Sequence, residues 1–326
     1  MTTRDKILSL FQPHPERYVS GQEISQMLGI SRAAVWKQIK ALRERGYTIE
    51  AKHALGYRLL EAPDLLRAAE IQSNLKTVII GKQVVSFEEI DSTNVEIRKM
   101  AEQGAAEGTV VIADRQSAGR GRLGRRWESP SAVNLYCSIL LQPQIPVHQA
   151  PQLTFLSAVA VAETLNQVCQ LSATVKWPND VLVGGAKIAG LLNEMNAETE
   201  RIHFVILGVG INLNMTAEQF PDALKYPTTS AFLETGRPVD RGSFLCTFLQ
   251  LLDQYYLEFQ AQGFAPIRRR WEGLCTMMNS AVSVEQPSGA IQGTVVGLDQ
   301  DGALRVRCAN GQIERILAGD VRPLEN

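Results

Sequence analysis

The sequence predicts an α+β protein built from three segments: a winged helix-turn-helix, a larger α+β domain with a mixed sheet, and a small SH3-like β-barrel. Three observations lead to this prediction. The first 62 residues carry two helix patterns and a short β-ribbon, the middle of the chain mixes apolar helices with hairpins, and from residue 279 onward only short β-runs split by glycines occur. We place the three domains at residues 1–62, 66–274 and 275–326.

Composition and charge limit the class of protein. The 326 residues are 45% hydrophobic and 21% charged, as in an ordinary globular protein. The longest apolar stretch, residues 153–162, is shorter than the roughly 20 residues of a membrane-spanning helix, and the start of the chain lacks a signal-peptide pattern. The five cysteines and four histidines are scattered without metal-site spacing. We therefore expect a cytoplasmic protein with no membrane partner, in which any metal arrives with a substrate.

The first segment is the basic part of the chain. Residues 1–62 hold ten Lys and Arg against six Asp and Glu, a net charge of +4, so the remainder carries −5. Ile24, Met27 and Leu28 form a short helix pattern that ends at Gly29, and a second helix begins after Ser31, which is a suitable N-cap. That second helix has an apolar stripe of Val35, Ile39 and Leu42 and is expected to stop at Gly46.

The opposite face of the second helix is cationic. It carries Arg32, Lys37, Lys40, Arg43 and Arg45, and residues 47–60 then alternate as a ribbon around Leu55 and Gly56. A solvated helix face would account for the charges alone, but the combination with the Gly turn and the ribbon is what a major-groove reader requires. We expect Ser31 and Arg32 to lie nearest base edges and Lys37, Lys40 and Arg43 to meet phosphates.

The middle segment begins after a linker at residues 61–66. Residues 75–90 look like strand, Ser92 or Thr93 caps a helix, and residues 108–113 form a buried strand. Residues 151–168 are apolar almost all round, as in a helix packed under a sheet. Three or four strands follow at residues 173–214, and Gly184-Gly185 marks a hairpin between two of them. The sheet is therefore expected to be partly antiparallel.

The string GRGRLG at residues 119–124 matches the G-x-G-x-x-G of dinucleotide-binding folds, but its context does not fit them. The glycines are followed by RRWESP instead of an apolar helix, and the other motifs of a kinase are absent. A flexible basic surface loop is the plain alternative. Four arginines within residues 120–126, namely Arg120, Arg122, Arg125 and Arg126, favour a loop that orders around a carboxylate or phosphate.

Five stretches together resemble the biotin protein ligases. They are STN (92–94), QSAGRGRLGRRW (116–127), KWPND (176–180), GGAKIAGLLNE (184–194) and GVGINLN (208–214). With the N-terminal winged helix, the chain is similar to the bifunctional type that is also the biotin operon repressor. The resemblance covers essentially the whole chain and implies a class II synthetase-like central domain.

The resemblance also implies a reaction and partners. ATP, with Mg²⁺, activates biotin to biotinyl-5'-AMP, and a lysine of the biotin carboxyl carrier protein of acetyl-CoA carboxylase accepts the biotin. Such chemistry depends on orientation and charge neutralisation, so it needs no enzyme nucleophile. The adenylate would favour a homodimer that binds operator DNA and represses biotin synthesis genes, and we expect ordering of the Arg120 loop to couple the two activities.

The family's site residues are carried over to matching positions of this chain. Those implied for biotin are Ser92, Thr93, Asn94, Gln116, Arg120, Gly121, Arg122, Lys187 and Gly190. Those implied for ATP are Arg122, Arg125, Arg126, Trp127, Lys176, Asn179 and Asn212. Lys187, Arg122 and Asp180 are the implied catalytic residues, and Asp180 would either position Mg²⁺ or take the proton of the incoming lysine. A turn role for Asp180, a surface role for Lys187 and a core role for Trp177 remain open.

Two positions depart from the family pattern. Asn193 stands where the family is expected to have a branched apolar residue, which puts a polar group beside the biotin pocket. Leu123 stands where the loop commonly has a polar or basic residue. On a strand, Lys187, Ala189, Leu191 and Asn193 share one face, so Lys187 is expected to project over a surface of small side chains. Gly190, Gly208 and Gly210 are expected to allow close approach of the ligand. Two other functions remain possible: a biotin-sensing transcription regulator without ligase activity, and a lipoate-type ligase of the same superfamily.

Overall fold

The chain folds into two compact units, residues 1–65 and 66–326. The structure, a computed structural model, describes residues 3–11, 17–44, 47–52, 55–61, 64–221, 226–286 and 289–324. The expected helix stop at Gly46, the basic Arg45 and residues 62–63 of the linker lie outside the described residues. Each unit has its own hydrophobic core, so we describe the two separately.

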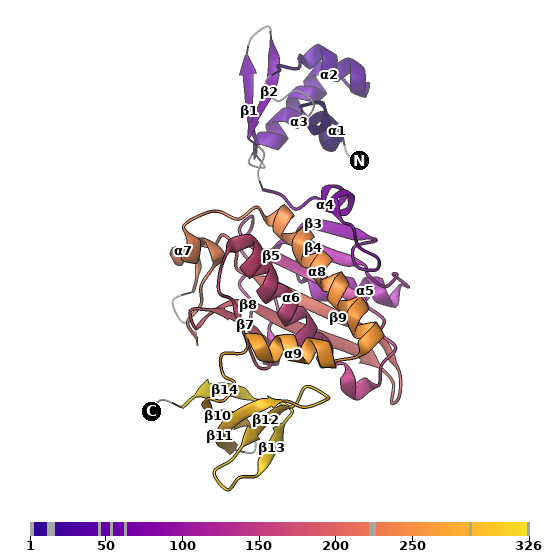
Figure 1. Ribbon diagram of the computed structural model, residues 1–326. Coiled ribbons are helices and arrows are strands. Elements are labelled where there is room, and N and C mark those ends of the chain that lie inside the picture. Colours follow the sequence, from indigo (N-terminus) through magenta and orange to yellow (C-terminus); the bar gives the residue numbers. More distant parts are fainter. Residues whose placement is uncertain are drawn as a thin grey trace. The chain divides into compact units, whose positions relative to one another are not determined.

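The first unit is a winged helix-turn-helix, as predicted (Figure 1). It contains α1 (Thr3–Phe11), α2 (Gly21–Leu28), α3 (Arg32–Glu44), β1 (Thr48–Lys52) and β2 (Gly56–Glu61), the last two antiparallel. Ser20 caps α2 by accepting the Glu23 N–H at 3.0 Å, and Gly29, with φ 64°, ends the helix. The apolar stripe of α3, Val35, Ile39 and Leu42, is 1% exposed and packs with Ile24. The two helix patterns are therefore confirmed.

The second unit is built on a seven-stranded mixed sheet of order β3-β4-β5-β9-β8-β7-β6. Its strands are β3 (Val84–Ile90), β4 (Val110–Gln116), β5 (Leu135–Leu141), β6 (Thr174–Lys176), β7 (Asp180–Val183), β8 (Ala186–Ala197) and β9 (Ile202–Ile211). The β3–β4 pair is parallel and the other pairs are antiparallel. The hairpin predicted at Gly184-Gly185 joins β7 to β8.

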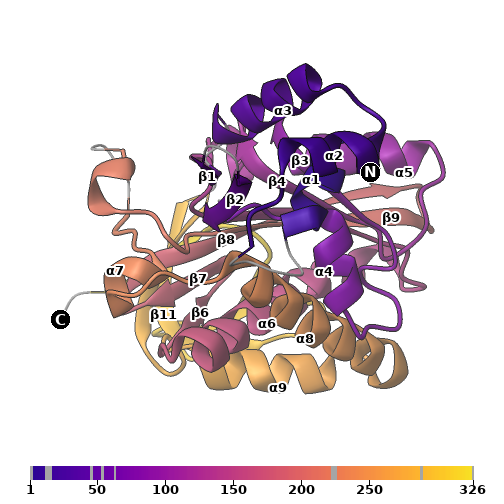
Figure 2. The ribbon, with the colours of Figure 1, turned by 90° about the horizontal axis from the view of Figure 1, so that it is seen from above.

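Helices cover both faces of this sheet (Figure 2). α6 (Gln152–Cys169), α8 (Arg241–Gln262) and α9 (Ala265–Leu274) pack into the main core on one face. α5 (Thr93–Glu102) packs on the other, where Ile97 meets Leu140 and Ile206. Two short helices, α4 (Ala68–Asn74) and α7 (Ala231–Thr235), complete the described set. The helix α6 is buried nearly all round, as its apolar sequence predicts.

One expected strand is only half present. Of residues 75–90, only Val84–Ile90 is strand. The backbone N–H groups of Val78, Ile79 and Ile80 instead donate to the buried carboxylate of Asp253 on α8, at 2.8 to 2.9 Å. Because this carboxylate satisfies three amides that a strand ladder would otherwise pair, the apolar run is stable without sheet pairing.

The chain closes with an antiparallel five-stranded sheet of order β13-β12-β11-β10-β14. Its strands are β10 (Ala281–Gln286), β11 (Gly289–Leu298), β12 (Leu304–Arg307), β13 (Ile313–Ile316) and β14 (Asp320–Pro323). Val282, Val284 and Val306 belong to the same core cluster as the central sheet, and the indole N–H of the buried Trp177 donates to Gly302 O at 3.2 Å. Among the described helices, none is long and apolar enough to cross a membrane.

Candidate active site

One cavity of about 280 Å³ brings together all the residues implied for biotin and ATP. It lies in the second unit and is lined by Ser92, Thr93, Asn94, Gln116, Arg120, Gly121, Arg122, Arg125, Arg126, Trp127, Lys176, Asn179, Asp180, Lys187, Gly190 and Asn212. Its lining holds six Lys and Arg side chains against three carboxylates, those of Glu128, Asp180 and Asp320. A cavity with this charge favours an anionic ligand.

The inner end of the cavity is a buried polar cluster where α5 begins. Ser92 occupies the N-cap position of α5 without a side-chain cap bond, which leaves its hydroxyl for other partners. Gln116 Oε1 accepts the Thr93 N–H at 2.9 Å, and Gln116 Nε2 donates to Ser129 Oγ at 2.9 Å. Asn94 Nδ2 donates to Leu192 O at 3.1 Å and to Glu194 Oε2 at 2.9 Å. The carbonyls and hydroxyls of this cluster are held in fixed directions and suit a small polar ring.

Ser138 on β5 organises this cluster and is absent from the residues inferred from the sequence. It is fully buried, and its Oγ lies 2.8 Å from Thr93 Oγ1 and 2.6 Å from Asn94 Oδ1. The only sign in the sequence is a serine inside the apolar run LYCSILL of a central strand. A buried hydroxyl needs partners, so such a serine points to a polar site on the adjoining element.

Glycines on the two central strands make room for two side chains of the site. Gly190 on β8 and Gly210 on β9 are directly paired, and the Trp127 indole lies across both. A Cβ at Gly190 would come within 2.9 Å of Trp127, one at Gly210 within 2.6 Å of Trp127, and one at Gly208 within 2.2 Å of Asn94. The glycines thus admit protein side chains. The indole N–H of Trp127 is buried without a hydrogen-bond partner among the described residues.

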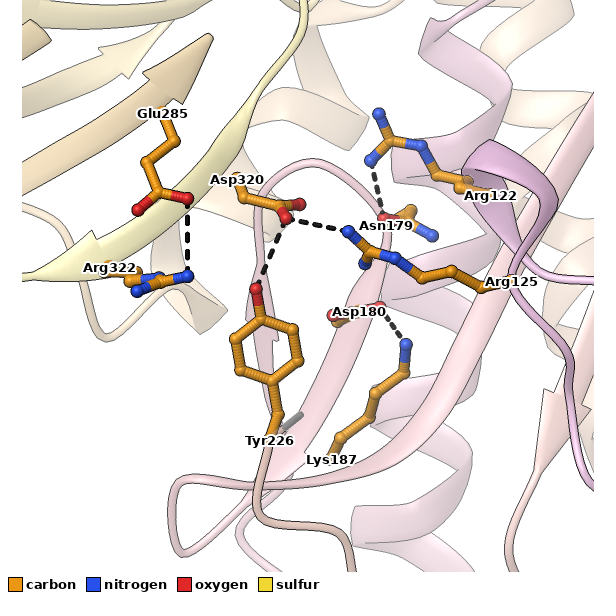
Figure 3. A network of polar contacts seen from close by, with 9 residues as sticks. All are labelled: Arg122, Arg125, Asn179, Asp180, Lys187, Tyr226, Glu285, Asp320 and Arg322. Carbon is orange, nitrogen blue, oxygen red and sulfur yellow. Dashed lines mark hydrogen bonds and ion pairs between the residues drawn. The ribbon is translucent and has the colours of Figure 1, made fainter. Parts of the chain in front are cut away.

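Lys187 projects into the cavity beside this indole. Its Nζ lies 5.4 Å from the centroid of the Trp127 ring and forms a 2.6 Å ion pair with Asp180 Oδ1 (Figure 3). Asp180 Oδ1 is itself buried, and the positive charge of Lys187 offsets part of the cost of burying this carboxylate oxygen. Asp180 is the first residue of β7 and Lys187 the second residue of β8, so both charges belong to the hairpin formed by these two strands.

The prediction that Lys187 shares one face of β8 with Ala189, Leu191 and Asn193 is wrong for Lys187. The pairing with β7 slips between Leu182–Lys187 and Val181–Ala189, which leaves Ile188 as a bulge. Lys187 therefore shares the cavity with Gly190 and Leu192, whereas Ala189 is buried in the main core. Leu191 also lines the cavity, but it is 2% exposed and belongs to that core. Asn193 points away from the cavity, and its Nδ2 donates to Thr154 Oγ1 on α6 at 2.8 Å. The polar group at Asn193 thus does not line the site.

The loop of glycines and arginines is folded back on itself. Arg120 and Arg126 form an antiparallel bridge, and the Gly121 N–H donates to Arg125 O at 2.7 Å. Leu123 and Gly124 turn the chain with φ values of 57° and 72°, and the Leu123 side chain is 81% exposed. Leu123 thus lies at the tip of the loop.

The arginines of the loop already have polar partners within the second unit (Figure 3). Arg122 Nη1 donates to Asn179 Oδ1 at 2.9 Å, and burial lowers the pKa of Arg122 while the charges of Asp320 and Asp180 oppose that shift. Arg125 Nη2 donates to Asp320 Oδ2 at 2.9 Å, which raises the pKa of Arg125. Tyr226 also donates to Asp320, at 3.3 Å. The C-terminal sheet thereby contributes a carboxylate to the cavity, and neither Asp320 nor Tyr226 was inferred from the sequence.

The remaining implied residues lie around the outer part of the cavity. Arg126 pairs with Glu128 at 3.1 Å, and Lys176 Nζ lies 5.1 Å from the ring centroid of Tyr226. Asn212 is buried, donates to Thr229 O at 3.1 Å and accepts from Asn134 at 3.3 Å. Asn212 is thus fixed by the fold. Trp177 lines the cavity but is 3% exposed and belongs to the core.

Within the described ranges, no three His, Cys, Asp or Glu side chains gather closely enough to hold a metal ion. Asp180 is one of the three carboxylates at the cavity, and its oxygen is a hard ligand of the type that Mg²⁺ takes in company with waters and substrate phosphates. The donor set therefore fits a cation that arrives with a nucleotide.

The residues expected to bind DNA lie on α3 of the first unit and, for Ser31, directly before it. Ser31 caps this helix by accepting the Ala34 N–H at 3.1 Å, and Arg32, Lys37 and Lys40 are exposed. Arg43 differs, because its Nε and Nη2 both donate to Ile49 O on β1, at 3.0 and 2.6 Å. The guanidinium of Arg43 therefore ties the wing to α3.

Comparison with known proteins agrees with this arrangement. Residues 86–212 match the Biotin/lipoate A/B protein ligase family, residues 3–58 match an HTH domain, and residues 278–322 match the Biotin protein ligase C terminal domain. Among solved structures, the biotin protein ligase from Aquifex aeolicus in complex with biotin and ATP superposes with a TM-score of 0.65 at 30% identity, covering 74% of this chain and 100% of that one.

Two curated relatives match nearly the whole chain. The bifunctional ligase/repressor BirA of Bacillus spizizenii is 38% identical over 320 residues, 98% of each protein. The bifunctional ligase/repressor BirA of Escherichia coli K12 is 31% identical over 93% of this chain and 92% of its own length. The match thus includes the winged helix, the central sheet with its cationic cavity and the C-terminal sheet, and the chain belongs to the family of the bifunctional ligase/repressors named BirA.

Proposed function

We propose that this protein uses ATP to activate biotin as biotinyl-5'-AMP and transfers the biotin to a lysine of the biotin carboxyl carrier protein of acetyl-CoA carboxylase. One observation carries the proposal: Lys187, Arg122 and the buried polar cluster at Thr93 and Gln116 line a single cationic cavity. The relatives named as ligases support the same activity for this chain.

The first step joins two anions. A biotin carboxylate oxygen attacks the α-phosphorus of ATP, the bond to the bridging oxygen breaks, and pyrophosphate leaves with its electron pair. Mutual repulsion of the reactants is the main obstacle, so the cavity acts by placing them and neutralising their charge. In our proposal Thr93, Asn94 and Gln116 hold the ureido ring of biotin, and Lys187 lies between its carboxylate and the α-phosphate.

The arginines bind the rest of the nucleotide in this proposal. Arg122 is half-buried next to Asn179, so a phosphate there would be bound in a region of reduced solvent screening. Arg125 and Arg126 lie further out and are paired with Asp320 and Glu128, which phosphate oxygens would replace. The planar guanidinium groups match phosphate with two hydrogen bonds each.

The second step transfers the acyl group to an amine. The neutral ε-amine of the carrier lysine attacks the biotinyl carbonyl, AMP leaves, and one proton must be removed from the nitrogen. Asp180 is the carboxylate at the cavity suited to take that proton, because its partner Lys187 lies 2.6 Å away and holds it in place. Mg²⁺, which we propose enters with ATP, would supply charge neutralisation on the phosphates beside Asp180.

The ligase activity is tested by mixing the full chain with ATP, Mg²⁺, biotin and a biotin carboxyl carrier domain. We expect the carrier to gain the mass of a single biotinyl group in an intact-mass measurement. Omission of ATP is the control. If the complete mixture leaves the carrier mass unchanged, the alternative of a biotin-sensing regulator without ligase activity replaces this proposal. Lipoate offered in place of biotin tests the other alternative, and a lipoyl mass shift would support it.

We further propose that the first unit binds operator DNA and makes the protein a biotin-responsive repressor of biotin synthesis genes. The exposed Arg32, Lys37 and Lys40 on α3 support this role. In the proposal the protein is cytoplasmic, biotinyl-AMP favours a homodimer, and the dimer places two first units on two half-sites. Sedimentation and DNA binding with and without biotin plus ATP test it, and the repressor half fails if neither changes at moderate salt.

A further inference from the structure

The solvent-facing side of α3 carries a large aromatic side chain among its cations. Trp36 is 59% exposed, although its neighbour Val35 and Ile39 one turn on are each 1% exposed. An indole ring left in water keeps a large apolar area hydrated, so covering it by a partner is favourable. Trp36 does not contribute to the core of the first unit, which consists of other residues.

Positive charge surrounds this ring. Arg32 and Lys40 lie four positions before and after Trp36, which places all three on one stripe of α3. Lys40 Nζ lies 5.8 Å from the centroid of the indole ring, and the adjacent Lys37 is exposed. An apolar ring with cations on either side matches a surface that has an apolar group between phosphates, because the ring can cover that group while the cations contact the phosphates. The major groove of DNA is such a surface, because the C5-methyl group of thymine projects into it.

We propose that Trp36 reads a thymine in the DNA site by covering its C5-methyl group, while Lys40 beside the ring meets a flanking phosphate. The inference rests on the proposed DNA-binding function and deepens it by naming a base-reading residue. Trp36 is the fifth residue of α3, and the N-terminal part of such a helix is the part that reaches base edges. Arg32, one turn earlier, would contact the neighbouring base pair.

The probe is the duplex that full-length protein with biotin and ATP enriches from a random-sequence library. Each thymine in that duplex is replaced in turn by deoxyuridine, which removes only the C5-methyl group. We expect one replacement in each half-site to weaken wild-type binding about fourfold, the loss corresponding to one buried methyl. The Trp36→Ala variant is expected to bind the unmodified duplex several-fold less tightly and to lose sensitivity at those positions alone.

Two further variants separate base reading from general effects. Met27 on α2 is 62% exposed, so Met27→Ala removes an equally exposed apolar side chain and is expected to leave the affinity and the deoxyuridine pattern unchanged. Lys40→Ala is expected to reduce the slope of log binding constant against log salt concentration by about one, the value for one lost phosphate contact. Trp36→Ala is expected to leave this slope unchanged. Thermal unfolding of each variant tests whether the first unit is still folded.

The outcomes distinguish the two proposals. If no duplex is enriched, DNA binding fails and the role of Trp36 fails with it. If a duplex is enriched but wild-type binding is insensitive to deoxyuridine at every thymine, the repressor function stands and the inference about Trp36 is overturned. The same holds if Trp36→Ala weakens binding but keeps the wild-type deoxyuridine pattern. The deoxyuridine series with wild-type protein tests the inference by itself, so its result does not depend on whether a variant folds.

Discussion

At the scale of single residues, Lys187 is the cation that our proposal places between the biotin carboxylate and the α-phosphate. We expect Lys187→Ala to lower the rate of biotinyl-AMP formation by about 10² to 10³, the loss typical of removing one charge-stabilising donor from a site. Pyrophosphate release in the presence of biotin measures this step without the carrier protein. The matched control is Lys99→Ala, which removes a lysine that is 55% exposed and paired with Glu96 on α5. Full activity in Lys187→Ala would remove this lysine from the mechanism.

Ser138 is a positioning residue in the proposed biotin site. Replacing it with Ala leaves Asn94 Oδ1 without its 2.6 Å partner and removes a neighbour of Thr93. We expect the KM for biotin to rise about tenfold with little change in kcat, because the ring-binding groups lose their fixed directions. We also expect the free energy of unfolding to fall by about 1–3 kcal/mol.

The control for Ser138→Ala is Ser157→Ala. Ser157 is also fully buried, but its hydroxyl bonds only to carbonyls of its own helix, Leu153 O and Thr154 O. This variant should leave the KM for biotin unchanged and alter stability little, because Ala favours the helix and no buried partner of the hydroxyl is left unsatisfied. If Ser138→Ala lowers stability but leaves the KM for biotin unchanged, its role is only structural.

The site residues that the sequence could predict lie in local motifs, whereas those it could not predict reach the site through long-range packing. Thr93, Gln116, Arg122 and Lys187 lie in local strings with a distinctive pattern, and the structure brings them to one cavity. Asp320 reaches the cavity from a strand that is 195 residues away from Arg125 in the sequence. No local pattern near Asp320 signals this contact, because it depends on how the C-terminal sheet packs on the central one.

At the scale of elements, the strand β8 shows how a small irregularity redirects side chains. Simple alternation groups Lys187 with Asn193, but the extra residue Ile188 in the pairing with β7 reverses the faces between them. A register change of one residue moves side chains to the other side of a sheet. The hairpin itself was predictable from Gly184-Gly185, whereas the bulge has no residue signature in the stretch AKIAG.

The paired glycines of β8 and β9 give a prediction for this element. Gly210→Ala would place a Cβ 2.6 Å from Cε2 of Trp127, so the indole must move away from the strands. Because Lys187 lies against the same ring, we expect kcat/KM for adenylate formation to fall by about 10², as for an ångström-scale displacement in an active site. Gly273→Ala is the control, since a Cβ there meets nothing within 4 Å and Ala favours its helix. Equal activity in both variants would mean that the position of Trp127 is not important for catalysis.

At the scale of the whole molecule, the two units have separate hydrophobic cores. The first unit relies on a small core around Ile24, Val35 and Ile39, and the second on a much larger cluster that runs from the central sheet into the C-terminal sheet. A domain of about 60 residues buries a smaller share of its surface than a larger one, so its stability is lower. We therefore expect two transitions in calorimetry, with the first unit unfolding at the lower temperature.

Ligands should shift these transitions selectively, because each ligand binds one unit in our proposal. Biotin and ATP, each at about 100 times its Kd, should together stabilise the second unit by at least about 2.7 kcal/mol and raise its Tm by roughly 5 °C or more. The transition of the first unit should stay where it is. The enriched duplex should do the opposite and raise the lower transition. A single transition that moves as a whole with either ligand would contradict this, because it would mean that the two cores unfold as one cooperative structure.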